Sequence, residues 1–462
     1  MRYHDALRYL YGLVDYEKRR IERYSPRVFK LDRVVQLLER LGNPHQAYPT
    51  LHIAGTKGKG SVSAMMAAVA QAGGLRTGLY VSPHLHTYRE RMQINRKPIS
   101  RAAMTALVEE IRPVVETVPE LTTFEVTTAL AFLHFQRQNV DLAVMEVGLG
   151  GRLDATNVIT PELSIITSLS LDHTDLLGET VAEIAYEKAG IIKPNVPVVT
   201  APQSAEALEV LRRIARERNA PLSVGGEDWN WESAARSRSG QAIRFRALTG
   251  PTTFDGTYTL PLLGNFQQEN AAVASAATAA LDATGHPWAN PQTLRAGLQS
   301  ATWPGRMEIL NETPPIIVDC AHNPYSAETL VESLGTWFPE ISWVLIFGAS
   351  TDKNTAGMLE VLLPASQHVI VTRSYHPRAA APYSLADLCA DLGHGAEIAI
   401  NPRRALEEAS RQLQPGWGIL ATGSIFLVAD VREAWAENGQ LRLPLGDWVD
   451  EPWDPVQAGA EQ

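Results

Sequence analysis

The chain has 462 residues, of which 45% are apolar and 20% charged, and its 41 Lys and Arg against 51 Asp and Glu give a formal net charge of −10. These values are typical of a globular protein with two or three domains, whose cores are large enough to fold without disulfides or structural metals. The acidic balance argues against a protein that coats nucleic acid or an anionic membrane through its overall field, but it allows anionic small substrates in a local basic pocket.

The cysteine content and the most apolar segments predict a cytoplasmic protein. Only Cys320 and Cys389 occur, without paired spacing or a nearby His cluster, so neither a disulfide framework nor a zinc site is expected. Residues 1–13 carry charges within what would have to be an apolar stretch, which excludes a secretory signal. The apolar run at residues 271–281 is too short for a membrane span and is predicted to be a buried helix.

From about residue 50, strand-like runs alternate with helical segments, which is the pattern of a parallel sheet covered by helices. In chain order we predict strands at 50–54, 77–81, 142–145 and 163–167, and helices at 61–72 and 181–189. The polar stretch at 223–259 shows signs of short antiparallel strands, and we interpret it as an insertion.

A second α/β series follows a connector at residues 301–306, where Pro and Gly end both neighbouring patterns. Its predicted strands are 316–320, 343–347, 369–372 and 419–421. We place the boundary near Trp303, so the α/β fold is predicted to have two domains, residues 1–303 and 304–462.

The strongest motif is a glycine-rich run between the first predicted strand and the helix after it. The run consists of Gly55, Thr56, Lys57, Gly58, Lys59, Gly60 and Ser61. Glycines let backbone N–H groups turn inward, the helix N-terminus adds partial positive charge, and the second lysine supplies a cation for the outer phosphates of a nucleotide. The alternative is a glycine-rich turn with a solvated lysine, but the flanking strand and helix favour triphosphate binding.

This run departs from the common P-loop pattern in two places. Ile53, five residues before Gly58, stands where that pattern has Gly, and Gly60 follows Lys59 in place of Ser or Thr. The hydroxyl that usually binds the metal is therefore displaced.

Candidate ligands for Mg²⁺ come in series at the ends of predicted strands. Ser82, Glu146, and the pair Asp172 and His173 each end or follow one of them. Mg²⁺ prefers oxygen ligands, and in open α/β sheets such groups collect beyond the carboxyl ends of the strands. Singly, each residue is more simply explained as a turn serine, a solvated glutamate or a loop histidine, but their shared placement favours a common site.

Three further features are open to a structural and to a functional interpretation. The glycine-rich stretch at residues 148–157 is either a loop held against a ligand or a surface turn. Lys188 lies in the last turn of a predicted helix, where the helix dipole favours a cation, so position alone favours a structural role. Asp319 and His322 could orient a nucleotide or an amine, or form a satisfied turn.

Together the motifs resemble those of the folylpolyglutamate synthase and dihydrofolate synthase branch of the Mur ligases, from about Tyr24 to Val431. The motifs that carry the resemblance are residues 54–61, 82–85, 146–157, 171–175, 187–190, 304–306 and 319–324. The run Gly148-Leu-Gly-Gly-Arg-Leu-Asp-Ala-Thr-Asn157 separates this branch from the cell-wall ligases. The resemblance implies an ATP-dependent ligase that joins glutamate to a folate, with a P-loop ATPase domain and a Rossmann-like C-terminal domain that closes over it. It also implies a monomer.

The resemblance further implies roles for individual residues. Residues 55–61 would bind ATP together with Asn270, Arg306 and Asp319, and Mg²⁺ would be bound by Ser82, Glu146 and His173. Lys188 matches a lysine that is carbamylated in this family. The catalytic residues would be Lys59, Lys188, Asp319 and His322, and glutamate would be bound by His322 and Ser424. The folate would lie against Thr122, Thr123, Phe124, Glu125, Leu153, Asp154 and Ala155.

Two departures from the family pattern stand out. Lys57 replaces a frequent Asn and adds a charge at the phosphate loop, and residues 264–267 replace a Gly-x-His-Gln segment that is expected to contact adenine. The alternatives are a Mur-type ligase for another carboxylate, such as a nucleotide-linked sugar acid, and a nucleotide-binding regulator that catalyses nothing. Whether dihydropteroate is also a substrate stays open at this point.

Overall fold

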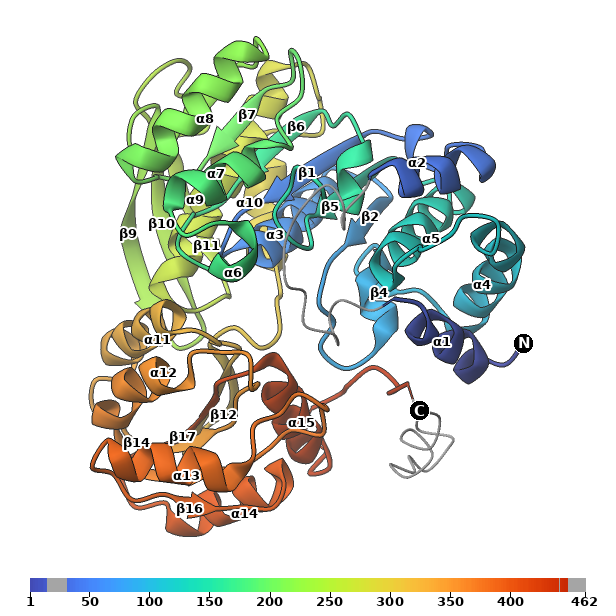
Figure 1. Ribbon diagram of the computed structural model, residues 1–462. Helices are drawn as coiled ribbons and strands as arrows, with labels where there is room; N and C mark the ends of the chain where they lie inside the picture. The colour runs from blue at the N-terminus through green and yellow to red at the C-terminus, as the bar shows by residue number, and fades with distance from the viewer. Residues whose placement is uncertain (15–30, 440, 448–462) are drawn as a thin grey trace.

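The computed structural model describes residues 1–14, 31–439 and 441–447, and these form two α/β units. Figure 1 shows the first unit in blue to yellow and the second in orange to red. Tyr24, where the family resemblance begins, and residues 448–462 of the predicted second domain lie outside the described residues.

The first unit is built on a sheet with the order β4-β3-β2-β5-β1-β6-β7-β8, which has eight strands within the described residues. From β2 to β8 the strands are parallel, and β3 and β4 form an antiparallel hairpin at one edge. Their bounds are β1 Thr50–Ala54, β2 Thr77–Tyr80, β3 Met92–Ile94, β4 Lys97–Pro98, β5 Leu142–Glu146, β6 Leu163–Ile166, β7 Val198–Thr200 and β8 Leu222–Val224. The four strands predicted for this part are confirmed.

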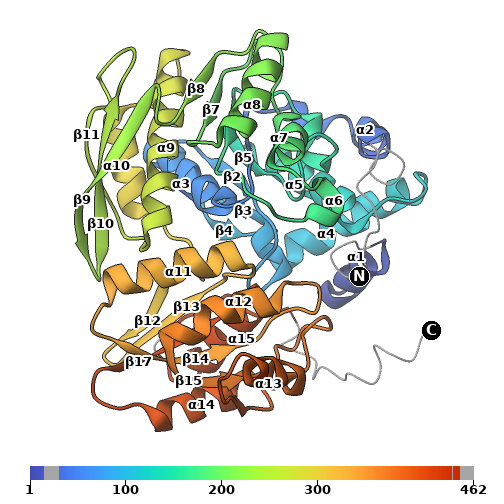
Figure 2. The same ribbon diagram turned by 60° about the vertical axis from the view of Figure 1, so that its left-hand side comes forward.

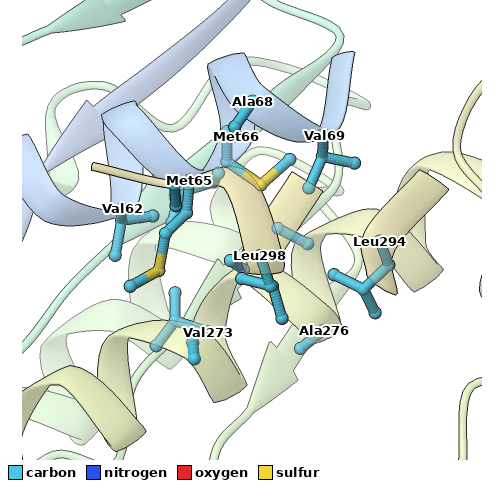
Figure 3. Close-up of a cluster of buried hydrophobic side chains, with 14 of the residues drawn as sticks. Val62, Met65, Met66, Ala68, Val69, Val273, Ala276, Leu294 and Leu298 are labelled. Carbon is cyan, nitrogen blue, oxygen red and sulfur yellow. The ribbon is translucent and has the colours of Figure 1, made fainter. Parts of the chain in front are cut away.

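The central strands of this sheet are buried at every residue, because helices cover both of its faces. One face packs against α3 (Lys59–Ala72), α9 (Asn265–Ala283) and α10 (Pro291–Ser300), whose apolar side chains interlock in Figure 3. The other face packs against α5 (Thr123–Arg137), α7 (Val181–Ala189) and α8 (Ala205–Glu217). The helices α1 (Tyr3–Gly12), α2 (Leu31–Arg40) and α4 (Arg101–Val115) pack around α5.

The stretch interpreted as an insertion forms an antiparallel sheet of β9 (Trp229–Ser237), β10 (Gly240–Ala247) and β11 (Gly256–Leu260), which confirms the predicted antiparallel strands. It is not peripheral, because Ile243, Phe245 and Tyr258 are buried in the same core as α9. Figure 2 shows this sheet beside α9 and α10.

The second unit has a sheet with the order β12-β13-β17-β14-β15-β16, parallel except for β12. Its strands are β12 Glu308–Glu312, β13 Pro315–Asp319, β14 Ser342–Phe347, β15 Ser366–Val371, β16 Glu397–Ile398 and β17 Trp417–Thr422. One face packs against α11 (Pro324–Trp337), α12 (Thr355–Leu362) and α13 (Pro382–Asp391), and the other against α14 (Pro402–Gln412) and α15 (Ile425–Ala436). The four strands predicted here are also confirmed.

The C-terminal segment 441–447 runs from the second unit back to the first (Figure 1). Its last residue, Asp447, is buried and accepts hydrogen bonds from the Tyr3 hydroxyl (2.6 Å) and the Tyr88 N–H (2.8 Å). The two units are therefore joined by this segment as well as by the connector before β12. Among the described residues, no helix has the length and apolar character needed to cross a membrane.

Candidate active site

One cavity of about 770 Å³ lies between the two units and contains most of the predicted site residues. Its wall includes residues at the carboxyl ends of β1, β2, β5 and β6 in the first sheet and of β13 in the second. The predicted residues that line it are Gly55, Thr56, Lys57, Gly58, Lys59, Gly60, Ser61, Ser82, Glu146, His173, Lys188, Asn270, Arg306, Asp319 and His322. Residues from separate sequence motifs thus line the same cavity.

The glycine-rich run forms a loop that leads into the N-terminus of α3. Gly58 has a left-handed conformation (φ 86°) as the N-cap residue, and Lys59 is the first helical residue. No side chain of the described residues caps this end, so the first N–H groups of α3 stay available to an anion, which the helix dipole also favours. Lys59 Nζ donates to the carbonyl oxygens of Gly55 (3.1 Å) and Thr56 (3.4 Å), so the ammonium folds back over the loop.

Two side chains of α9 hold this loop from the other side. Asn270 Nδ2 donates to Gln267 Oε1 (2.9 Å), and Gln267 Nε2 donates to the Ser61 hydroxyl (3.2 Å). A Cβ atom at Gly58 would lie 2.2 Å from Asn270 Oδ1, so this contact requires glycine. Residues 264–267 form the segment that departs from the family pattern. Within it, Gln267 supports the phosphate loop through Ser61, whereas Phe266 lines the cavity.

Glu146 is the best candidate for a cation ligand. It is the last residue of β5, only 4% exposed, and its Oε2 accepts the Ser82 backbone N–H (3.2 Å). Burial raises the pKa of Glu146 to about 7, although nearby Lys59 acts in the opposite direction. A buried carboxylate with so few hydrogen-bond partners fits a hard divalent cation, whose charge would favour the ionised form.

The other two predicted ligands, Ser82 and His173, line the same cavity. The His173 side chain is 42% exposed, and its partial desolvation lowers its pKa, which favours the neutral imidazole with a lone pair to donate. Within the described parts of the chain, no three His, Cys, Asp or Glu residues lie together as a ready-made metal site. A Mg²⁺ ion here would need phosphate and water oxygens to complete its shell, which is how this ion is usually bound with nucleotides.

Lys188 is buried in the last turn of α7, with 4% of its surface exposed. Burial, followed by the neighbouring charge of Lys59, lowers its pKa to about 7. A helix-end lysine with only a structural role would be solvated, so burial in the cavity wall favours a functional role for this amine.

Asp319 and Arg306 bring the second unit to the cavity. Asp319 is the last residue of β13, and its carboxylate accepts the N–H groups of Met307 and Ala321, both at 2.8 Å. Burial raises the pKa of Asp319, although the charge of Arg306 acts against this. Asp319 thus fixes the turn that carries Arg306, and both residues line the cavity.

Lys57 connects the two units directly. Its Nζ donates to Asp172 Oδ2 at 2.9 Å and lies 3.1 Å from His322 Nε2. Burial alone would raise the pKa of Asp172, but the charge and hydrogen bond of Lys57, together with His173 and His322, outweigh it and hold that pKa well below its usual range. Burial, together with the charge of Lys57, lowers the pKa of His322 well below its usual value. His322 is therefore a neutral imidazole.

Comparison with known proteins identifies the family. The Mur ligase middle domain matches residues 53–278, and the Mur ligase glutamate ligase domain matches residues 305–425. The dihydrofolate synthase/folylpolyglutamate synthase of Bacillus subtilis is 34% identical over 414 residues, which cover 87% of this chain and 94% of that protein. The chain belongs to the Mur ligases, in their folylpolyglutamate and dihydrofolate synthase branch.

Solved structures of this branch share the whole architecture. Mycobacterium tuberculosis folylpolyglutamate synthase complexed with ADP has a TM-score of 0.84 and 33% identity, and the match covers 96% of this chain and 99% of that one. Escherichia coli FolC in complex with DHPP and ADP has a TM-score of 0.82 and 30% identity, with coverages of 95% and 99%. The predicted fold class is confirmed, and the protein is an ATP-dependent, amide-bond-forming ligase.

The residues expected to bind the folate of this ligase do not line the cavity. Thr122 is the N-cap of α5, where its hydroxyl accepts the Glu125 N–H (3.1 Å) and the Glu125 carboxylate accepts the Thr122 N–H (2.7 Å). Glu125 also pairs with Arg33 at 3.2 Å, and the Thr123 hydroxyl donates to the Leu10 carbonyl at 2.9 Å. These polar side chains hold α5 in place.

The other folate candidates surround the glycine-rich loop after β5. Asp154 accepts the N–H groups of Gly148 and Leu149 (both 3.0 Å), so it shapes that loop from within. Phe124 packs so closely on Gly148 that a Cβ atom there would lie 2.5 Å from its ring. Leu153 and Ala155 belong to neighbouring apolar clusters. Their assignment to folate binding stays a prediction.

Ser424 is the N-cap residue of α15, where its hydroxyl accepts the Leu427 N–H (3.0 Å). It is 5% exposed and does not line the cavity, whereas the next residue, Ile425, does. A role of Ser424 in glutamate binding stays a prediction.

The cavity wall also holds a polar network that was not predicted from the sequence. Arg432 of α15 lies 3.0 Å from Glu308 of β12 and bonds His86, which follows β2. His86 Nδ1 in turn lies 3.0 Å from Glu433. The motif at residues 82–85 adjoins His86, but nothing in the sequence pattern indicates its partners some 346 residues away.

Proposed function

We propose that this ligase joins L-glutamate to the carboxylate of a folate, with ATP as co-substrate and Mg²⁺ as the metal, and that it also accepts dihydropteroate. The names of the relatives in Bacillus subtilis and Mycobacterium tuberculosis combine both synthase activities, which supports the two acceptors. The observation that carries the proposal is the single cavity in which the phosphate loop of the first unit lies opposite Arg306 and His322 of the second.

The chemistry has two steps. A free carboxylate is a poor electrophile, so the terminal phosphoryl group of ATP is first transferred to a carboxylate oxygen of the acceptor, and ADP leaves. The amino nitrogen of glutamate then attacks the carbonyl carbon of this acyl phosphate, the C–O bond to phosphate breaks, and the amide forms. The second step requires an uncharged amine, so a proton must leave the ammonium form of glutamate.

The residues of the cavity suit these steps. Lys59 and Arg306 neutralise charge on the moving phosphoryl group, which is a positioning and electrostatic task. Glu146, Ser82 and His173 would hold Mg²⁺, which supplies further positive charge to the phosphates when bound.

The residues of the second unit suit the amine step. The neutral imidazole of His322 accepts a hydrogen bond from the amine and orients it, and Asp319 holds the turn beside it. Closure of the two units over the cavity would exclude water that hydrolyses the acyl phosphate. A carbamate on Lys188 would add a negative charge to the metal site.

Further assignments belong to the same proposal. Asn270 and Asp319 contact ATP, His322 and Ser424 bind glutamate, and the segments around residues 122–125 and 153–155 bind the folate. The two units form domains at residues 1–303 and 304–462. The enzyme is a cytoplasmic monomer whose partners are small molecules, without nucleic acid or membrane.

A product assay tests the function. Purified enzyme is given ATP, Mg²⁺ and glutamate with tetrahydrofolate or with dihydropteroate, and ADP and the amide product are quantified by chromatography and mass spectrometry. We expect ADP release that requires both substrates and an acceptor heavier by one glutamate residue. Lys59→Met should lose amide formation while the fold is retained. ATP turnover that ignores both substrates contradicts the proposal, and a product formed only from a sugar-linked carboxylate assigns the enzyme to another Mur-type substrate.

A further inference from the structure

Lys57 occupies an unusual position, because three loops from two domains meet at its ammonium group. Its backbone belongs to the phosphate loop after β1, and its carbonyl oxygen accepts the Thr167 hydroxyl (2.6 Å). Its Nζ contacts Asp172 from the loop after β6 and His322 from the loop after β13. The side chain is only 20% exposed and that of Asp172 only 13%, so the ion pair is largely removed from water.

The hydrogen bonds of His322 define which ring nitrogen accepts. Its Nδ1 lies 2.9 Å from the backbone carbonyl oxygen of Cys320, which can only accept, so Nδ1 carries the hydrogen. In a neutral ring the lone pair is then on Nε2, and Lys57 Nζ donates to it at 3.1 Å. The lone pair that could accept a hydrogen bond from an amine substrate is therefore occupied by Lys57.

A nucleotide would compete for the same ammonium group. The loop that carries Lys57 supplies the N–H groups of an anion site at the start of α3, and Lys57 lies within that loop. A polyphosphate bound there brings several negative charges close to Nζ, whereas His322 offers only a neutral lone pair. Asp172 is held by the His173 backbone N–H (3.0 Å) as well as by Lys57, so it keeps a hydrogen bond if the lysine turns away.

We propose that Lys57 is a positioning residue that couples nucleotide binding to the amine-binding residue of the second domain. Without nucleotide, Lys57 bridges Asp172 and His322 and blocks Nε2. With nucleotide, the phosphates draw Nζ away, and Nε2 accepts a hydrogen bond from the ammonium group of glutamate. This inference rests on the proposed function, because it takes glutamate as the amine substrate.

Binding measurements test the coupling. Glutamate affinity is measured by calorimetry with and without the non-hydrolysable nucleotide AMPPCP and Mg²⁺, for the wild type and for Lys57→Met. We expect the nucleotide to raise the affinity of the wild type by about tenfold to a hundredfold, the range of a typical coupling between two sites. In Lys57→Met, Nε2 is free at all times, so glutamate should bind with nearly the same affinity in both conditions.

Two further variants separate coupling from structural damage. Lys57→Arg retains a cationic donor and should restore part of the nucleotide effect. Lys353→Met is the matched control, because the charge of Lys353 also acts on His322, but its Nζ lies 4.0 Å from Asp352 and not on the imidazole. This variant should keep the full nucleotide effect.

A spectroscopic readout reports on the ring itself. The ¹⁵N resonance of His322 Nε2, assigned with His322→Gln, should shift when AMPPCP is added to the wild type and should stay unchanged in Lys57→Met. An equal response of glutamate affinity to nucleotide in wild type and Lys57→Met overturns the coupling, even where the enzyme forms its glutamate amide. Absence of any glutamate-dependent product instead contradicts the proposed function.

Discussion

Gly297 of α10 lies directly against the backbone of Val69 in α3, so that a Cβ atom at residue 297 would be 2.5 Å from the Val69 Cα. This contact brings α10 against α3, the helix whose N-terminus follows the phosphate loop. Figure 3 shows the crossing, with Val69 beside Leu294 and Leu298. The anion site thus depends on a glycine far from it in the sequence.

Gly297→Ala should destabilise the protein by about 1–3 kcal/mol, because the new methyl group meets backbone atoms that cannot move independently. The displaced α3 should also weaken nucleotide binding. Thermal unfolding and AMPPCP titration measure the two effects. Gly335→Ala in α11 is the control, since a Cβ there meets nothing within 4 Å and should stabilise by about 0.5–1 kcal/mol. Equal unfolding temperatures for the two variants would contradict the packing argument.

Lys188 should carry a carbamate. Its pKa is lowered to about 7, so the amine is mostly uncharged above that pH and can react with CO₂. Protein equilibrated with ¹³C-bicarbonate should show a carbamate resonance that is absent in Lys188→Met, and amide formation should fall as the pH drops below 7.

The control for this experiment is Lys193→Met. Lys193 also has a lowered pKa, about 8, but its Nζ donates to the Asn157 carbonyl (2.8 Å) outside the cavity lining. The resonance should survive in this variant. Full activity of Lys188→Met would refute a role for the carbamate.

Asp430 should make stability depend on pH. It lies in α15, accepts the Tyr375 N–H (3.0 Å), and has its pKa raised by burial to about 7. Between the unfolded value of 3.8 and 7, the folded state keeps a proton that the unfolded state releases, so this contribution to stability is lost as pH rises through that window.

Asp430→Asn should remove this slope and stabilise the protein at pH 8 by about 1 kcal/mol, a value reduced for partial solvent screening. Urea unfolding from pH 4 to 8 measures the slope. Asp387→Asn on the exposed surface of α13 is the control. Parallel losses of stability in the wild type and Asp430→Asn as the pH rises would rule out this contribution of Asp430.

Asp447 should anchor the C-terminal segment. Its carboxylate accepts hydrogen bonds from Tyr3, Thr87 and Tyr88. Asp447→Ala leaves these buried donors unpaired and should cost about 1.5–3 kcal/mol, whereas Asp447→Asn keeps part of the bonding. Because Arg442 and Pro444 of this segment line the cavity, the alanine variant should also raise the KM for a substrate. Unchanged unfolding temperature and KM would show that the segment is dispensable.

Much of the site could be predicted from local sequence. The strand at 50–54, the glycine-rich turn and the helix after it are adjacent in the chain, so short-range periodicity and helix-end chemistry were sufficient to place Lys59. The burial of Lys188 could not be predicted, because its position in the last turn of a helix is compatible with either environment. The capping role of Thr122 and Glu125 was not predicted either, because the reciprocal bonds that cap α5 and the pairing of Glu125 with Arg33 are seen only in the structure, and their assignment to folate stays a prediction.

By itself, the sequence determined the two α/β series, the phosphate loop and the family, because each of these is written in residues close together along the chain. Only the tertiary structure decided that Lys57 meets Asp172 and His322, and that Asp447 returns to Tyr3. These contacts join residues 115, 265 and 444 positions apart, and their formation depends on how two sheets pack, which no local pattern encodes.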